Sequence, residues 1–270
     1  MENMKKEGEK IDFFNNKKGQ ITLFIIIAIV IVVLGVLIYL FYPKISAIFG
    51  GAQEQDPNAF IQNCVEDDLK NNLNLISLQG GSLDPEPYIL YQDDKIQYLV
   101  YTEEFYQKGV VQKPFLEKQI EKEVKRGIQQ KVKACFNELK TSFEDIGYEV
   151  SMKEGDINVN LIPQKVVATF NYSVKLIKSE TKKYESFNVV VNNNLYELAS
   201  IADSIVDLES EYGDADVSLY MDLYHKLKVE KKSPGYGTSI YVLTDRETND
   251  KFQFAAKSVV MPPGYGVDIV

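Results

Sequence analysis

Two cysteines and one histidine carry the side chains of this chain that are best suited to redox or metal chemistry. Cys64 and Cys135 both lie in stretches whose apolar residues recur every three to five positions, so both thiols should face a core. In an oxidising compartment such a pair forms a disulfide, whereas in a reducing one the two residues would act as small buried hydrophobes. We expect a Cys64–Cys135 disulfide in an exported domain.

A metal or cofactor site is not expected from these residue types. Two cysteines and the single His225 do not complete a tetrahedral zinc site, and no C-x-x-C spacing occurs in the sequence. Asp214-Ala215-Asp216 offers carboxylate oxygens to a cation but lacks the ligand ladder of a calcium loop.

Catalysis is also not expected. His225 stands in the alternating stretch 223–227, which predicts an exposed strand residue rather than a general base. The sequence has no nucleophile elbow, P-loop, zinc-protease helix or dinucleotide-binding glycine motif. Its acidic clusters predict solvated helix faces: Glu66-Asp67-Asp68, and Asp203, Asp207, Glu209 and Glu211. We therefore expect no catalytic residue and no enzyme.

One modification site can be read from the sequence. Asn171-Tyr172-Ser173 is an N-glycosylation acceptor sequence if the domain is exported. It falls inside an alternating stretch that predicts a strand, which is an unfavourable place for an acceptor. Asn171 is therefore a candidate glycosylation site only.

The N-terminal region contains the feature that predicts the cellular location of the protein. Residues 21–42 are an unbroken apolar run without a charge, and a helix of that length matches the ~30 Å core of a bilayer. A cleaved signal peptide is the alternative, but its apolar region is usually ~7–15 residues and ends at small residues. This run ends in Tyr39, Phe41 and Tyr42, followed by Pro43, so we expect a retained transmembrane helix.

Lysines flank this run asymmetrically and predict its orientation. Five precede it and only Lys44 follows it closely; the five are Lys5, Lys6, Lys10, Lys17 and Lys18. The excess of positive charge stays on the cytoplasmic side. The N-terminus should therefore be cytoplasmic and the rest of the chain extracytoplasmic.

The remaining sequence predicts an α+β domain with an antiparallel sheet, two cysteine-bearing helices and one covering helix. Helical periodicity occurs around 60–76, over 113–143 and over 195–212. Alternating stretches predict hairpins and a meander of strands: 88–91 with 96–101, then 148–152, 157–162, 166–177, 184–191, and finally 239–244 with 251–259.

These elements define the expected domain organisation. It runs 1–20 as a basic cytoplasmic region, 21–42 as the membrane helix, 43–57 as a hinge, 58–145 as a helical subregion with a hairpin, 146–260 as a β-rich subregion and 261–270 as a tail. The net charge of −9 and pI near 4.9 argue against a nucleic-acid surface, which needs clustered lysine and arginine.

The chain as a whole resembles an uncharacterised family of single-pass membrane proteins from small-genome archaea. The motifs that carry the resemblance are Lys17-Lys18-Gly19-Gln20 with the apolar run, Phe60-Ile61-Gln62-Asn63-Cys64, Leu78-Gln79-Gly80-Gly81, Ala134-Cys135-Phe136-Asn137-Glu138-Leu139 and Phe252-Gln253-Phe254-Ala255. This resemblance implies an architecture and no activity.

The first of these motifs is also similar to the archaeal class III signal of type IV pilin-like proteins. That similarity implies cleavage after Gly19, which leaves Gln20 at the mature N-terminus. Many pilin-type subunits carry glutamate at the fifth mature position, where this chain has Phe24. The alternative is that Lys17 and Lys18 are ordinary positive-inside flanking residues.

These observations together predict a membrane-anchored cell-surface structural or interaction protein. In one version it is a pilin-like subunit that assembles with copies of itself, or with other surface proteins, through its apolar helix. The alternative is a non-assembling accessory or sensor ectodomain of a membrane complex. The expected partners are the lipid bilayer and surface or membrane proteins, without nucleic acid.

Overall fold

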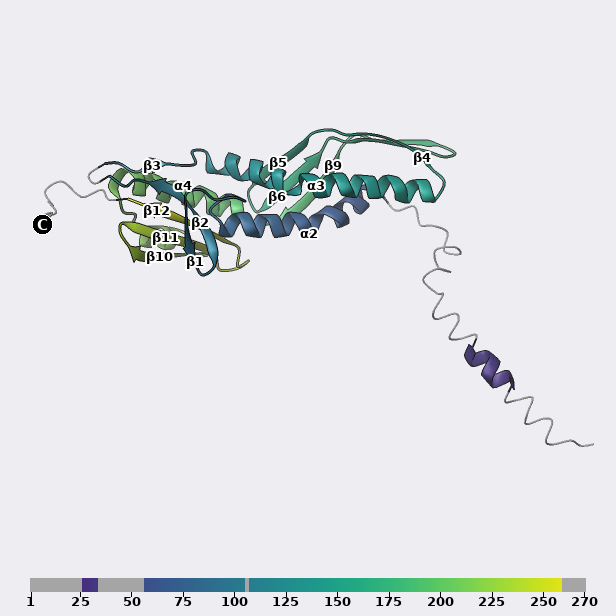
Figure 1. Ribbon diagram of the computed structural model, residues 1–270, viewed down its shortest axis with the longest axis horizontal. Coiled ribbons are helices and arrows are strands. Elements are labelled where there is room, and N and C mark those ends of the chain that lie inside the picture. Colours follow the sequence, from purple (N-terminus) through teal and green to yellow (C-terminus); the bar gives the residue numbers. More distant parts are fainter. Residues whose placement is uncertain (1–25, 34–55, 105–106, 259–270) are drawn as a thin grey trace, which may run out of the picture. The chain divides into compact units, whose positions relative to one another are not determined.

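The computed structural model describes residues 26–33, 56–104 and 107–258 (Figure 1). The chain divides into two compact units, Met1–Glu54 and Gln55–Val270. Residues 26–33 are helical, and the rest of the predicted span 21–42 lies outside the described residues. Across the described ranges, no helix combines the length and hydropathy that a membrane crossing requires.

Two long helices form the centre of the second unit, α2 (Pro57–Leu78) and α3 (Leu116–Asp145), as their periodicity predicts (Figure 1). Asp56 caps α2 by accepting a hydrogen bond from the Asn58 backbone N–H at 3.2 Å. Both helices bury a stripe of residues at spacings of mainly four: Ile61, Val65, Leu69, Leu73 and Ile76 on α2, and Leu116, Ile120, Val124, Ile128, Val132, Cys135, Phe136, Leu139 and Phe143 on α3. The two stripes belong to one hydrophobic core.

The two helices run antiparallel in a regular register. Lys131 forms an ion pair with Asp68 at 3.1 Å, one turn along each helix from the cysteines. One further turn along, Gly127 faces Asn72, whose side chain occupies the space that a Cβ atom at position 127 would need. Glycine therefore lets α2 approach α3 closely at this point.

A three-stranded antiparallel ribbon follows α3, and each of its strands is broken near the middle. One half is the sheet β4-β7-β8 and the other is β5-β6-β9. The strand bounds are β4 Glu149–Lys153, β5 Ile157–Ile162, β6 Lys165–Phe170, β7 Ser173–Ile177, β8 Thr181–Tyr184 and β9 Phe187–Asn192. The prediction of continuous strands over 166–177 and 184–191 is wrong, because the chain passes from one sheet to the other within each stretch.

The central break has a clear physical cause at Tyr172. Its ring is buried and stacks on Phe136 of α3 with the centroids 4.0 Å apart. Gly155 lies against the carbonyl of Asn171, where any Cβ atom would collide. An inserted aromatic ring on one strand and a glycine on its neighbour therefore bend the ribbon toward α3.

A third sheet has six strands in the order β1-β2-β12-β11-β10, and β3 pairs with β2 on the same side as β1. Its strands are β1 Tyr88–Tyr91, β2 Asp94–Tyr101, β3 Val110–Val111, β10 Leu227–Gly235, β11 Thr238–Asp245 and β12 Lys251–Lys257. Both predicted hairpins are present, but β2 and β12 pair in parallel. The predicted α+β class with an antiparallel sheet is therefore confirmed by the two sheets of the ribbon, whereas the six-stranded sheet is mixed.

This sheet combines strands from both predicted subregions, 58–145 and 146–260, which therefore interleave in one compact unit. The sequence did not predict β10, which carries several charged residues and a proline. It also did not predict the short helix α5 (Ser218–Leu223). His225 follows α5 in an exposed turn, so its prediction as a strand residue is wrong.

The helix α4 (Leu195–Tyr212) has the predicted bounds and packs against β11, β12 and α3. At its contact with α3, the Asp203 carboxylate accepts a hydrogen bond from the backbone of Leu116, and Ser200 Oγ donates to Glu117 Oε1 at 3.1 Å. Burial of Asp203, with the nearby negative charges of Glu117 and Asp207, raises its pKa to about 6. Asp203 is therefore only partly exposed and does not belong to a fully solvated face.

This raised pKa predicts a pH-dependent effect of Asp203→Asn. Because the folded pKa is about 6 and the ordinary value is 3.8, the folded protein binds this proton more tightly than the unfolded chain. The wild type therefore loses stability as the pH rises from about 4 to about 6. At pH 7 we expect the free energy of unfolding of D203N to exceed that of the wild type by about 1–2 kcal/mol, a value that is reduced because Asp203 is partly exposed. At pH 3.5 the two free energies should be equal.

Denaturant titration at the two pH values measures this difference. Asp67→Asn on the exposed face of α2 is the matched control and should change stability little at either pH. An equal effect of D203N at both pH values would contradict the assignment.

Candidate functional site

A disulfide joins the two central helices near the start of the compact unit. Cys64 on α2 and Cys135 on α3 are bonded, with their Cα atoms 5.9 Å apart. Cys135 is fully buried, and Cys64 is partly exposed at the seam. The structure thus brings together the two residues that the sequence paired. The bond connects the first helix of this unit to its 30-residue helix α3.

The disulfide lies next to the largest aromatic cluster of the core. Phe136, the neighbour of Cys135, stacks on Tyr172 and contacts Phe170 and Phe187 edge-on, with centroid distances of 6.2 and 5.0 Å. All four rings are buried. The covalent link and the aromatic contacts therefore join α2, α3, β6, β9 and the break between β6 and β7 at one place.

A second polar centre lies under α4 and was not predicted. Glu209 is only 1% exposed, so its prediction as part of a solvated helix face is wrong. Its Oε1 atom accepts hydrogen bonds from the Tyr241 hydroxyl of β11 and from Lys231 Nζ of β10, the latter at 3.1 Å. Lys231 also pairs with Asp214 and lies over the Tyr241 ring, 5.1 Å from its centroid.

We call the cluster of Glu209, Tyr241, Lys231 and Asp214 the Glu209 lock, because its charges and hydrogen bonds hold neighbouring elements together. Burial and the adjacent Glu209 carboxylate raise the pKa of Tyr241 above its ordinary value, so the phenol stays protonated and donates its hydrogen bond. Lys231 supplies the positive charge that a buried carboxylate needs. The cluster therefore ties α4 to the β10–β11 hairpin. The sequence did contain a sign that Glu209 is buried. It follows Ile205 and Val206 by four and three residues, so it lies on the same buried stripe of α4.

An open cleft of about 910 Å³ lies at the N-terminal end of α4. It is formed by the β9–α4 junction and the β11–β12 loop. Asn194 holds these segments together: its side chain donates to Asp245 and Thr248 at 3.0 and 3.2 Å, and its backbone N–H donates to Asp250 at 2.9 Å.

Two of the four carboxylates that line this cleft, those of Asp245 and Asp250, accept these hydrogen bonds. Burial works against the charge of Asp245, but hydrogen bonds from the backbone of Thr248 and Glu247 and from Asn194 hold its pKa below the ordinary value. An ionised, fully hydrogen-bonded carboxylate is a poor general acid or base at neutral pH. The cleft therefore provides a hydrogen-bonding surface and no evident nucleophile–base pair among the residues that line it.

The other residues considered from the sequence lie apart from one another. Asn171 is exposed in the break between β6 and β7, rather than within a strand as predicted, while the next residue, Tyr172, is buried. Asp214 pairs with Lys231, and Asp216 accepts a hydrogen bond from the Ser218 backbone. Gly19 and Gln20 lie outside the described residues.

Within the described part of the chain, no three His, Cys, Asp or Glu side chains are placed to share a metal ion. Comparison with protein-family models, curated proteins and solved structures finds no match for this chain. The candidate functional features are therefore those of its own structure: the disulfide seam, the Glu209 lock and the surfaces they support.

The Glu209 lock predicts unequal effects for two neighbouring lysines. Lys231→Met leaves a buried carboxylate without its cation and should lower the free energy of unfolding by about 2–4 kcal/mol. Lys232→Met removes only an exposed pair with Glu230 and should change it by less than about 0.5 kcal/mol. Chemical denaturation followed by circular dichroism compares the variants. Equal effects would show that the buried pair has no special importance.

The disulfide predicts a large loss of stability on its removal. The bond closes a loop with a sequence separation of 71 residues. Replacing both cysteines with alanine should therefore cost about 4 kcal/mol in the chain-entropy model. The check is denaturation of the wild type and the double variant, each with and without reductant. Reductant should destabilise only the wild type. Labelling of both thiols in the folded, unreduced protein would exclude the bond.

Proposed function

We propose that this protein is a membrane-anchored cell-surface structural or interaction protein. Residues 21–42 form its single transmembrane helix, with the N-terminus in the cytoplasm and the compact unit 55–270 outside. The observation that carries the proposal is the Cys64–Cys135 disulfide at the start of this unit. Structural disulfides persist in oxidising compartments, where the lysine asymmetry also directs the domain.

The composition of the exported part supports a surface role. The chain carries a formal charge of −9, which keeps an exposed domain soluble and disfavours adsorption to anionic headgroups. Asn171 is exposed in the break between two strands, where an attached glycan would meet solvent.

Within this proposal, assembly through the apolar helix is the leading version. Lys17-Lys18-Gly19-Gln20 is similar to a class III signal, and cleavage after Gly19 would leave the apolar helix at the new N-terminus. Phe24 in place of the usual glutamate means that such helices would pack by apolar contacts alone. The alternative is an unprocessed accessory or sensor ectodomain bound to a membrane complex.

Protease treatment of intact cells tests the orientation. We expect a tag after Val270 to be removed from intact cells, while a cytoplasmic control protein with the same tag survives until the membrane is broken. Survival of the C-terminal tag in intact cells would contradict the proposed orientation.

Mass spectrometry of the N-terminal peptide from the same membranes separates the two versions. A terminus at Gln20, with filaments in electron micrographs, supports the assembling version. A terminus at Met1 or Glu2 and a fixed stoichiometry with one partner support the accessory version.

A further inference from the structure

The edge strand β1 is unlike the opposite edge of the six-stranded sheet. Its sequence, Tyr88-Ile89-Leu90-Tyr91, contains no charge and no proline, and Leu90 is 65% exposed. The opposite edge strand β10 carries Lys228, Glu230, Lys231, Lys232 and Pro234. Charges and proline on an edge discourage pairing with another strand, so β10 is protected and β1 is open.

The hydrogen-bonding groups of β1 point outward at two residues. The turn after β1 has Gln92 and Asp93 at φ of 50° and 73°, a two-residue hairpin turn that makes Tyr91 and Asp94 a hydrogen-bonded pair. The Tyr98 backbone N–H donates to the Pro87 carbonyl at 2.9 Å, consistent with this alternation. The backbone groups of Tyr88 and Leu90 therefore face away from β2. Within the described chain, β1 pairs with β2 alone.

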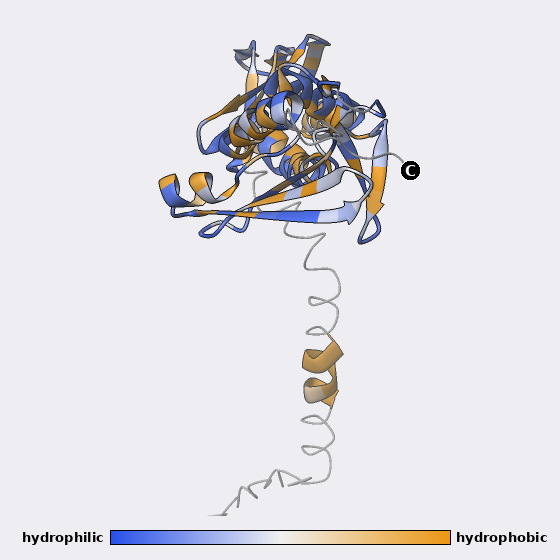
Figure 2. Ribbon diagram, turned by 90° about the vertical axis from the view of Figure 1, so that its left-hand side faces the viewer, coloured by the Kyte–Doolittle hydropathy of each residue, from blue (hydrophilic) through white to orange (hydrophobic). Residues whose placement is uncertain are grey.

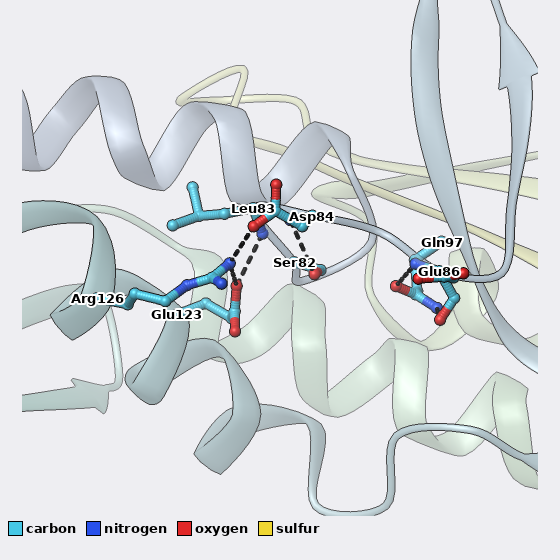
Figure 3. A network of polar contacts seen from close by, with 7 residues as sticks. All are labelled: Ser82, Leu83, Asp84, Glu86, Gln97, Glu123 and Arg126. Carbon is cyan, nitrogen blue, oxygen red and sulfur yellow. Dashed lines mark hydrogen bonds and ion pairs between the residues drawn. The ribbon is translucent and has the colours of Figure 1, made fainter.

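A polar network holds this edge in place (Figure 3). Glu123 of α3 accepts a hydrogen bond from the Leu83 backbone at 2.9 Å, and Arg126 pairs with Asp84 at 2.9 Å. The buried Gln97 accepts from the Glu86 backbone N–H at 2.9 Å and donates to its carbonyl at 2.8 Å. The segment entering β1 is thus ordered before any partner binds, which lowers the entropic cost of binding.

Acidic side chains stand at both ends of this edge. Glu86 precedes β1 and Asp93 follows it; both are exposed, and neither belongs to an ion pair among the described residues. Asp84 is neutralised by Arg126. The cation Lys95 on β2 lies over the Tyr88 ring, 5.1 Å from its centroid.

These charges disfavour a second copy as the occupant. In the antiparallel self-pairing that is centred on Ile89, both outward-facing residues are used, and Tyr88 lies opposite Leu90 of the second copy. In that register Glu86 lies opposite Gln92 and next to Asp93 of the other chain, at both ends of the pairing. Like charges so placed oppose association.

From these observations we propose that β1 is a docking edge for an extended peptide segment of another protein, apolar in its middle and with lysine or arginine at both ends. The segment adds a strand to the sheet through the backbone groups of Tyr88 and Leu90. Glu86 and Asp93 select its basic ends. The inference is independent of membrane attachment, so either proposal can fail without the other.

The test uses the full-length chain in lipid nanodiscs and three fluorescent peptides with the same alternating valine–threonine centre. One has lysine pairs at both ends, one has glutamate pairs and one is uncharged. The lysine peptide should bind at least roughly tenfold more tightly than the glutamate peptide in anisotropy titrations at low salt. Hydrogen exchange should slow at the amides of Tyr88 and Leu90 when it binds.

Variants separate the two contributions. Glu86→Gln with Asp93→Asn should weaken the lysine peptide about fivefold to tenfold and leave the uncharged one unchanged. Leu90→Pro removes one outward N–H and should abolish binding of all three. Leu90→Lys, at an exposed position that tolerates polar residues, should also block the edge and keeps the test valid if the proline variant does not fold. Lys232→Glu on β10 is the matched control at the opposite edge and should have no effect.

Three outcomes would overturn the proposal. The first is equal binding of the lysine and glutamate peptides. The second is no binding of the lysine peptide up to a concentration on the order of 1 mM. The third is concentration-dependent dimerisation that Leu90→Lys abolishes, because it would make a second copy of this chain the occupant of β1.

Discussion

The antiparallel packing of α2 against α3 is the interaction on which the remaining structure depends. Along its length, α3 buries one side chain or more on every turn. The ribbon, the six-stranded sheet and α4 all pack against the pair. Phe136 occupies the centre of this arrangement, with Cys135 toward α2 and the bent ribbon on its other side. The other helices and strands of the compact unit are therefore arranged around α2 and α3.

The hydropathy view of the compact unit agrees with this organisation (Figure 2). Apolar and polar positions alternate along its helices and strands in this view, and most of the buried residues are apolar. Glu209 is an exception, a carboxylate within the apolar contact between α4 and the sheet. Its partners come from β10 and β11, so the lock fixes how that hairpin docks on the helix.

Local periodicity was sufficient to predict the three long helices α2, α3 and α4 and two hairpins, because each rests on contacts between residues close in sequence. The bounds of α4 and the cysteine pairing follow from apolar residues that recur at helical spacing in the sequence. The bend at Tyr172 depends on Phe136, which lies far away in the sequence, so alternation within 166–177 carried no sign of it. The parallel pairing of β2 with β12 is equally non-local.

Predictions from composition were wrong where a charged residue has a partner that is distant in the sequence. Glu209 was assigned to solvent because Asp203, Asp207 and Glu211 nearby in the sequence are also acidic. The strand β10 was missed because lysines and a proline interrupt its apolar alternation. The edge strand β1 was found as part of a hairpin, but its position at a sheet edge requires knowledge of the sheet order. Candidate interaction surfaces of this kind are properties of topology rather than of local pattern.

The position of the disulfide has a mechanical consequence. A force applied between the two ends of the chain enters α2 at Pro57 and reaches the cross-link after about two helical turns. From there the covalent path passes directly to Cys135, and the intervening segment carries no tension. That segment includes β1, β2 and β3, and it withholds roughly 240 Å of contour length from extension. The hairpin that carries β1 is therefore not extended by this force, although β12, its neighbour in the sheet, lies on the loaded part of the chain.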